Sequence, residues 1–318
     1  MKRVNVLLTF ILLSAGMPYA YGQGLISRSK KQEITIAKPK KSNKKILGTD
    51  KSPILEKPTV PVDVIIKKGQ EEEAKNDFYE AIKWYRLAAE QGDADGQYHL
   101  GRMYEYGRGT SKSDYEAVLW YSAAAKQDNA QAQLELGGRY KRGDGVIQDF
   151  TQAAQLFQKA AEQGNVTAQT LLSIMYAKGE GVTKNVDEAL KWGSIADKNG
   201  DPIVIWNLAR IYRESEEYAD AMKCYHILAD KGDAEAQFEI GYMYVTGRGV
   251  PKDYTIGIDW YRKAAENGSS NAQNSLGYMY MQGVGVIQDY GEARKWLEKA
   301  ASQGNLQAKT YLDKIPKQ

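Results

Sequence analysis

The side chains that could support catalysis are few in this chain and far apart. Nucleophilic and metal-dependent catalysis both draw on His, Cys and acidic side chains that meet at one point. The 318 residues include two histidines, His99 and His226, and one cysteine, Cys224. The histidines fall in different halves of the chain, so we expect no shared metal site. A lone cysteine cannot form a disulfide within the chain, and we expect Cys224 to be buried on a helix.

Two further patterns have the spacing of catalytic sets. Ser-x-x-Lys, the spacing of a serine nucleophile and its lysine in penicillin-binding proteins, occurs at 27–30 and 42–45. Both copies lie in a Lys-rich segment with no preorganised surroundings. The acidic residues at 71–73 and 216–217 fall at predicted turns or exposed helix faces, and we interpret them as solvated charge. The sequence therefore predicts no catalytic residue, no cofactor and no metal.

A glycine-rich loop at 247–250, Gly-Arg-Gly-Val, could suggest phosphate binding. That interpretation requires a preceding strand and the spacing of a P-loop or a dinucleotide fingerprint, and neither is present. The two glycines instead supply backbone angles that end a helix, and Pro251 prevents simple helical continuation. The loop is predicted to be a structural connection.

This loop belongs to a unit that recurs along most of the sequence. Helical spacing of small and apolar residues predicts a first helix before the loop, around 236–244. A second helix is predicted after Asp253, a plausible N-cap, with small Ala264 and Ala265 where the next unit would pack. Aligned on one glycine of the first helix, the unit is found at Gly101, Gly137, Ser173, Ala209, Gly241 and Gly277, with spacings of 36, 36, 36, 32 and 36 residues. A fixed period of this size indicates a solenoid whose units bury their apolar faces only by stacking.

Two units are shorter than the others. The units starting near Val62 and Pro202 lack four residues, which correspond to the glycine-rich loop. We expect a tight turn in its place. The prediction is seven helical pairs, two short and five long, closed by a last helix at 306–315.

The pattern A-Q-x-x-(L/I)-G-x-x-Y-x-x-G-x-G-V followed by D-Y-x-x-x-x-W-Y-x-K-A-A-x-x-G resembles the Sel1-like repeat, a relative of the tetratricopeptide repeat. It covers about four fifths of the chain, and the unit at 166–200 departs from it by Ser173 and Gly193. The resemblance implies an all-α fold, a right-handed α/α superhelical solenoid. It also implies a non-catalytic scaffold for protein interactions, in envelope assembly or in contact with host proteins.

The resemblance to tetratricopeptide arrays also implies that the first helix of each unit lines the concave face. The positions three before and one after the aligned glycine share one helix face. In order they are Tyr98 and Arg102, Leu134 and Gly138, Thr170 and Ile174, Trp206 and Arg210, Phe238 and Tyr242, and Asn274 and Tyr278. We expect a groove for a peptide or partner loop at the aromatic positions, with Arg102, Arg210 and Arg213 receiving carboxylates. The alternative is that the rings pack between neighbouring helices.

The N-terminal part has a different character. Residues 1–22 combine Lys2 and Arg3, an apolar run at 4–13 and small residues before Gln23, which predicts a cleaved signal peptide and a periplasmic or secreted protein. Residues 23–61 are rich in Lys and are expected to be a disordered linker. The solenoid is expected over 62–318, as a monomer without nucleic acid and without a membrane span after cleavage.

Two other functions stay open at this point. Some cysteine-rich relatives are linked to penicillin binding and β-lactam hydrolysis, which makes an enzyme acting on β-lactams or peptidoglycan the first alternative. The second alternative is binding of an anionic polymer or a membrane surface through the Lys-rich linker.

Overall fold

The computed structural model describes residues 60–316, and every regular element in that range is an α-helix. The predictions for residues 1–22, and for all but the end of the linker, lie outside the described residues. In chain order the helices are α1 (Val62–Ala74), α2 (Phe78–Glu90), α3 (Ala94–Tyr106), α4 (Asp114–Ala125), α5 (Ala130–Arg142), α6 (Phe150–Glu162), α7 (Val166–Lys178), α8 (Val186–Lys198), α9 (Val204–Glu214), α10 (Tyr218–Ala229), α11 (Ala234–Thr246), α12 (Tyr254–Glu266), α13 (Ser270–Gln282), α14 (Tyr290–Ser302) and α15 (Leu306–Leu312).

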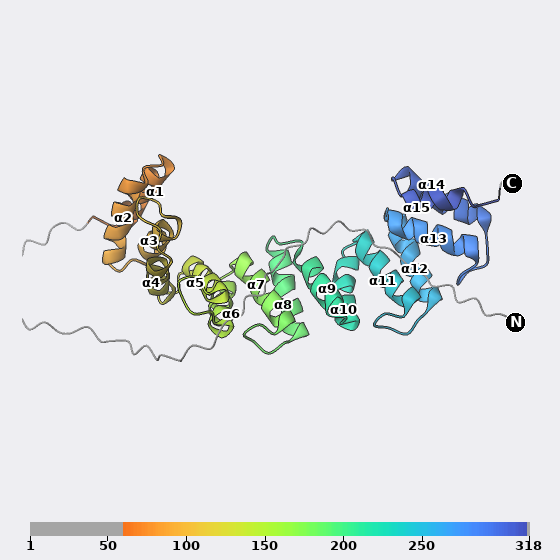
Figure 1. The fold of residues 1–318 in the computed structure, drawn as a ribbon, viewed down its shortest axis with the longest axis horizontal. Coiled ribbons are helices and arrows are strands. Elements are labelled where there is room, and N and C mark those ends of the chain that lie inside the picture. The colour runs from red at the N-terminus through yellow and green to blue at the C-terminus, as the bar shows by residue number, and fades with distance from the viewer. Residues whose placement is uncertain (1–59, 317–318) are drawn as a thin grey trace, which may run out of the picture. The chain divides into compact units, whose positions relative to one another are not determined.

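The helices are stacked in chain order. Each helix contacts the next one in the sequence, and some odd-numbered helices also contact the next odd-numbered helix, as α7 does with α9 and α11 with α13 (Figure 1). The buried side chains form six successive clusters instead of one central core. This arrangement confirms the predicted all-α solenoid of stacked two-helix units.

Most helices begin at a side chain that caps them. An Asp, Asn or Ser side chain accepts a hydrogen bond from a backbone N–H of the first turn in α2 to α8 and in α11 to α15. Such caps satisfy backbone donors that have no partner within the helix. The helices without one, α1, α9 and α10, all belong to the two short pairs.

The connection inside a pair takes two forms. In the five long pairs, the odd-numbered helix ends at a glycine in the left-handed conformation, for example Gly247 with φ 75°. In the short pairs the chain reverses in a tight turn, with Asn76 at φ 63° and Glu216 at φ 60°. A left-handed glutamate is strained by about 1 kcal/mol or more. Both short pairs thus reverse the chain without the glycine-rich loop.

Successive pairs are joined by close backbone approach and by buried glutamines. A Cβ placed on Gly96 of α3 would be 2.5 Å from Ala88 Cβ of α2, so small residues are required here, as predicted for the alanine pairs. Gln237 of α11 donates to the Ala229 carbonyl at the end of α10, and its own Oε1 accepts from Asn267 at 2.9 Å. The side-chain amide thereby joins three consecutive helices, which gives the Ala-Gln dipeptide of the repeat a physical role.

The last helix is shorter than expected. It ends at Leu312 instead of residue 315, because the chain turns there and Ile315 folds back into a buried cluster with Leu297. Pro316 disfavours a helical conformation of the residue before it, which agrees with this ending.

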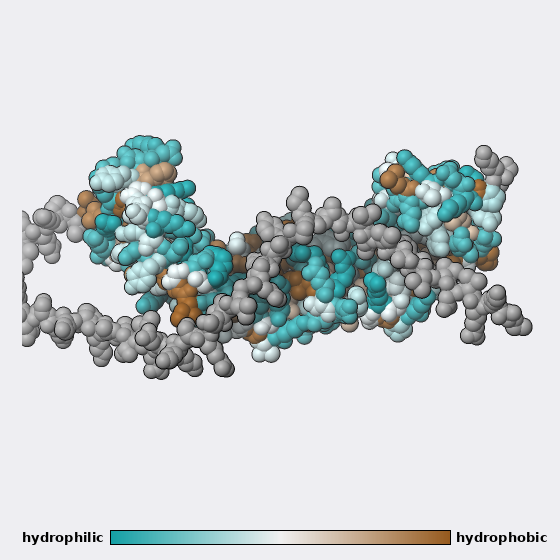
Figure 2. All heavy atoms as spheres, viewed as in Figure 1, coloured by the Kyte–Doolittle hydropathy of each residue, from teal (hydrophilic) through white to brown (hydrophobic). Residues whose placement is uncertain are grey.

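The outer surface carries apolar residues in small separate groups. On the face shown in Figure 2, hydrophobic patches alternate with hydrophilic side chains along the helices. Tyr79, Leu87, Tyr115 and Leu119 are exposed on α2 and α4. Among the described residues, no helix combines the length and the apolar character needed to span a membrane.

Candidate binding surface on the odd-numbered helices

The surface expected to bind a partner is formed by side chains of α3, α5, α7, α9, α11 and α13, and we call it the odd-helix surface. Its members are the residues three before and one after the aligned glycine. Most of these side chains are half-buried, Arg210 is exposed and Asn274 is buried. The Asn274 amide donates to Gln307 Oε1 of α15, so it faces the end of the stack.

Trp206 and Phe238 are anchored between neighbouring helices. The Trp206 ring meets the edge of Tyr225 at 5.7 Å, and its indole N–H donates to Asp233 Oδ2 at 3.1 Å. Phe238 stacks on Tyr261 with ring centres 5.4 Å apart. Both rings therefore stabilise the stack as well as contributing part of their surface to the outside.

Tyr242 and Tyr278 are also half-buried, and each packs against a buried cluster. The Tyr242 ring lies 6.4 Å from Phe238 and 5.5 Å from the Arg248 guanidinium, and Tyr278 lies 5.1 Å from Tyr311. Neither hydroxyl forms a hydrogen bond with another residue in the range 60–316. A partner can therefore contact the ring edge and the hydroxyl of either tyrosine without breaking a hydrogen bond within the chain.

Helix α3 carries a tyrosine and an arginine at these positions. The Arg102 guanidinium lies 5.9 Å from the Tyr98 ring, and the neighbouring His99 stacks on Tyr85 at 4.5 Å. Burial, followed by the charge of Arg102, lowers the pKa of His99 below its usual value. His99 is therefore a neutral packing residue near neutral pH.

The three arginines expected to receive carboxylates are not equivalent. Arg213 already pairs with the chain's own Glu239 at 3.3 Å, although burial raises the pKa of that carboxyl. Arg210 makes a loose contact of 3.7 Å with Glu214, and both of these side chains are more than half exposed. Arg102 has no ion pair within the described range. Arg102 and Arg210 are thus the more available of the three.

A buried arginine was missed by the sequence reasoning. Arg139 of α5 is almost fully buried and pairs with Glu105 at 3.1 Å and Asp114 at 3.0 Å. Glu105 also accepts a hydrogen bond from the Tyr121 hydroxyl at 2.5 Å. A signal existed in the sequence, because the other long pairs have methionine at this position, namely Met103, Met175, Met243 and Met279.

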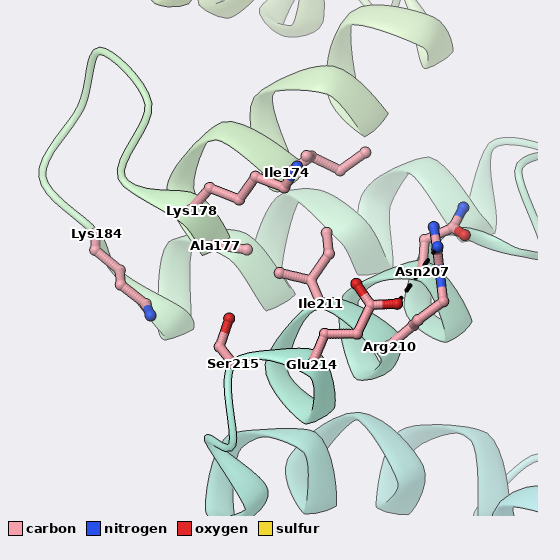
Figure 3. Close-up of a pocket in the computed structure, with 9 residues that line it drawn as sticks. All are labelled: Ile174, Ala177, Lys178, Lys184, Asn207, Arg210, Ile211, Glu214 and Ser215. Atoms are coloured by element: carbon pink, nitrogen blue, oxygen red, sulfur yellow. Dashed lines mark ion pairs between the residues drawn. The ribbon is translucent and has the colours of Figure 1, made fainter. Parts of the chain in front are cut away.

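A hollow of about 490 Å³ lies between α7 and α9 (Figure 3). Arg210 lines this hollow and is the one residue of the expected binding site that does so. Ile174, another residue of the odd-helix surface, lines it as well. Its other lining residues are Ala177, Lys178, Lys184, Asn207, Ile211, Glu214 and Ser215. Sequence reasoning found the four-residue deletion at this junction but did not derive a hollow from it.

The remaining chemistry of the described residues is sparse. Cys224 is fully buried on α10, and burial raises the pKa of its thiol to about 12, so it is not a thiolate nucleophile at neutral pH. His99 and His226 lie on α3 and α10. No cluster of His, Cys, Asp and Glu suited to a metal ion is found within residues 60–316. The Ser-x-x-Lys patterns lie outside that range.

Six segments of the chain match a family of known proteins. The family model described as Sel1 repeat matches residues 67–93, 94–129, 130–165, 166–201, 234–269 and 270–305. The short pair α9–α10 lies in the gap between the fourth and fifth matches. No curated protein matches the chain.

Two solved structures illustrate the similarity. A Sel1 repeat protein from Oxalobacter formigenes is 32% identical, with 75% of this chain and 99% of that chain covered and a TM-score of 0.45. A protective antigen of uropathogenic Escherichia coli, described as displaying an SLR fold, is 34% identical over 80% of this chain, with a TM-score of 0.46. This chain spans 56% of the length of that antigen.

Proposed function

Because this chain belongs to the Sel1 repeat family, we propose that it is a non-catalytic scaffold that binds a partner protein or peptide on its odd-helix surface. Sel1 repeat proteins are generally protein-interaction scaffolds, and the family is typically non-enzymatic. The finer part of the proposal concerns which surface binds and where in the cell binding takes place.

The observation that carries the choice of surface is the state of Tyr242 and Tyr278. Both occupy positions that the repeat pattern leaves free, yet both are large aromatic residues with hydroxyls that no described residue engages. Tyrosine side chains of this kind are enriched at the centres of protein interfaces. Their neighbours Trp206 and Phe238 hold the same surface rigid, which lowers the entropy lost on binding.

We further propose that the scaffold acts in the periplasm or outside the cell, in envelope assembly or in contact with host proteins. Support comes from the sequence of residues 1–22, with two basic residues followed by an apolar run. The test is the intact mass of the protein recovered from the periplasm of a bacterial expression host. A mature chain beginning at Gln23 would support export, whereas uncleaved protein in the cytoplasm would contradict it.

The binding surface is tested with two matched variants. The first changes Tyr242 and Tyr278 to Ala on α11 and α13, and the second changes Tyr79 and Tyr115 to Ala on α2 and α4. Both variants lose two tyrosines, and the control pair is the more exposed, at 65% and 63%. Folding of each variant is checked by circular dichroism.

Envelope and host-cell extracts are passed over each immobilised protein, and the affinity of each captured protein is then measured after purification. We expect the first variant to bind its partner at least about tenfold more weakly than the unmodified chain. The control variant should bind normally. A partner that is lost by the control variant and kept by the first would place binding on the even-numbered helices and overturn the proposal.

A further inference from the structure

At regular junctions of the stack, the glycine-rich loop of one pair fills a space on the preceding pair. At two of these junctions, the residue between the two glycines also forms an ion pair with the preceding pair. Arg108 contacts Glu73 of α1 at 3.2 Å, and Glu180 contacts Lys141 of α5 at 3.2 Å. The second glycine then packs on the start of the preceding even-numbered helix, where a Cβ on Gly181 would be 2.0 Å from the Phe150 carbonyl oxygen.

The junction between α7 and α9 lacks this filling. The α9–α10 pair is short, so only the turn at Ser215–Glu217 joins its helices. This turn reaches back to Lys184 of the α7–α8 loop, which pairs with Glu217, and it makes no ion pair with α7 itself. The position that holds Glu73 in α1 and Lys141 in α5 is occupied in α7 by Ala177, which lines the hollow. The hollow thus lies at the position where Arg108 and Glu180 contact the preceding pair at two other junctions.

The side chains around the hollow favour a negative group. Lys178, Lys184 and Arg210 line it, with Glu214 as the one lining carboxylate (Figure 3). The pairs that these cations make, Lys178 with Glu180 at 3.9 Å, Arg210 with Glu214 at 3.7 Å and Lys184 with Glu217, are all partly exposed. Exposed ion pairs of this kind contribute about 0–1 kcal/mol to stability. Breaking them so that the cations can bind a ligand therefore costs little free energy.

We propose that this hollow receives the carboxylate of an Asp or Glu side chain from the bound peptide, with Lys178 and Arg210 as the main contacts. The inference rests on the proposed function, because it specifies part of the partner's sequence. The contact between Glu180 and Lys141 shows the same recognition made within the chain one junction earlier. Ile174 and Ile211 also line the hollow, and their apolar side chains can contact the methylene groups of such a side chain.

The test uses fluorescein-labelled dodecapeptide mixtures, each with one position fixed as Glu, Gln, Lys or Leu and the others randomised. Binding to the full chain is measured by fluorescence anisotropy at 150 mM and 500 mM salt. The test variant is Lys178→Gln with Arg210→Gln. The matched control is Lys191→Gln with Arg262→Gln, which removes the same two residue types from exposed sites on α8 and α12, where each pairs with an acidic residue of its own helix.

We expect the unmodified chain and the control to prefer Glu over Gln at one peptide position by about tenfold, the usual size for a charge-assisted hydrogen bond. The test variant should lose this preference and keep any preference for apolar residues at other positions. If the double variant loses helicity, Lys184→Gln provides the same test at a third lining residue.

Three results would overturn the inference. A Glu preference that survives in the test variant would show that the carboxylate binds elsewhere. Peptide binding without any Glu preference would leave the scaffold proposal standing and remove the hollow as a carboxylate site. If no mixture binds the unmodified chain at either salt concentration, the peptide-binding proposal and this inference both fail.

Discussion

Gly241 lies directly against the buried ring of Tyr261. A Cβ on Gly241 would be 2.6 Å from Tyr261 Cδ1 and 2.9 Å from the carbonyl oxygen of Gly257, closer than such contacts are found. The glycine of α11 therefore lets α12 approach to backbone distance. The same relationship holds between Gly137 and Phe157 of the α5–α6 pair.

We predict that Gly241→Ala destabilises the protein by about 1–3 kcal/mol, the usual cost of overpacking a core. Gly138→Ala is the matched control, because Gly138 is also a helical glycine but its Cβ would meet only the flexible end of Arg142. Alanine should stabilise α5 there by about 0.5–1 kcal/mol. Urea denaturation measures both values, and equal effects at the two sites would contradict the packing role of Gly241.

A second prediction concerns the buried Arg139. Replacing it with Met leaves Glu105 inside the stack without its cation, so Arg139→Met should cost about 3 kcal/mol or more. Adding Glu105→Val and Tyr121→Phe removes the polar groups left behind, and the triple variant should recover most of that loss. A single variant as stable as the unmodified chain in thermal and urea denaturation would show that the ion pair is dispensable.

The third prediction is a pH dependence at Glu135. Burial, and then the charge of Glu105, raises the pKa of the Glu135 carboxyl above its usual 4.5. The folded chain therefore holds this proton more tightly than the unfolded chain, and stability falls as the pH rises through the raised pKa. Glu135→Gln removes that penalty, so its urea midpoint should exceed that of the unmodified chain at pH 7.

The advantage of Glu135→Gln should vanish below about pH 4, where glutamate is protonated in both states. Glu298→Gln on the exposed side of α14 makes the same change in net charge and serves as the control. An equal gain from both variants would assign the effect to overall charge and contradict the local explanation.

The fourth prediction concerns Cys224. Because its thiol is fully buried and its pKa is raised to about 12, a disulfide reagent at pH 8 should label it far more slowly in the native protein than in urea. The release of the reagent's chromophore measures both rates. Native labelling at the denatured rate would show that α10 opens freely and that the thiol is accessible.

Much of the fold could be predicted because each unit repeats the same local signals. Residues such as Asp253 and Gly247 mark where helices begin and end, and their roles depend on neighbouring residues alone. The positions of the aligned glycines could likewise be predicted from the repeat spacing, without knowing which distant residues are in contact. The end of α15 was predicted less well, because Ile315 is placed by tertiary packing after a turn.

The binding surface was harder to predict, because availability depends on contacts across pairs. Arg213 and Arg210 look equivalent in the sequence, yet only Arg213 meets a partly buried carboxylate, that of Glu239 from the next odd-numbered helix. Trp206 likewise donates to Asp233, a residue 27 positions away. The hollow between α7 and α9 arises from a deletion, and its lining is assembled from residues of two different pairs.

The central claim, that the odd-helix surface binds the partner, is tested most directly by hydroxyl-radical footprinting of the chain alone and in complex with its captured partner. Oxidation of each tyrosine reports the solvent exposure of its own side chain. We predict that binding protects Tyr242 and Tyr278 and leaves Tyr79 and Tyr115 as reactive as in the free chain. Protection of Tyr79 and Tyr115 with no change at Tyr242 and Tyr278 would contradict the claim and place the interface on the even-numbered helices.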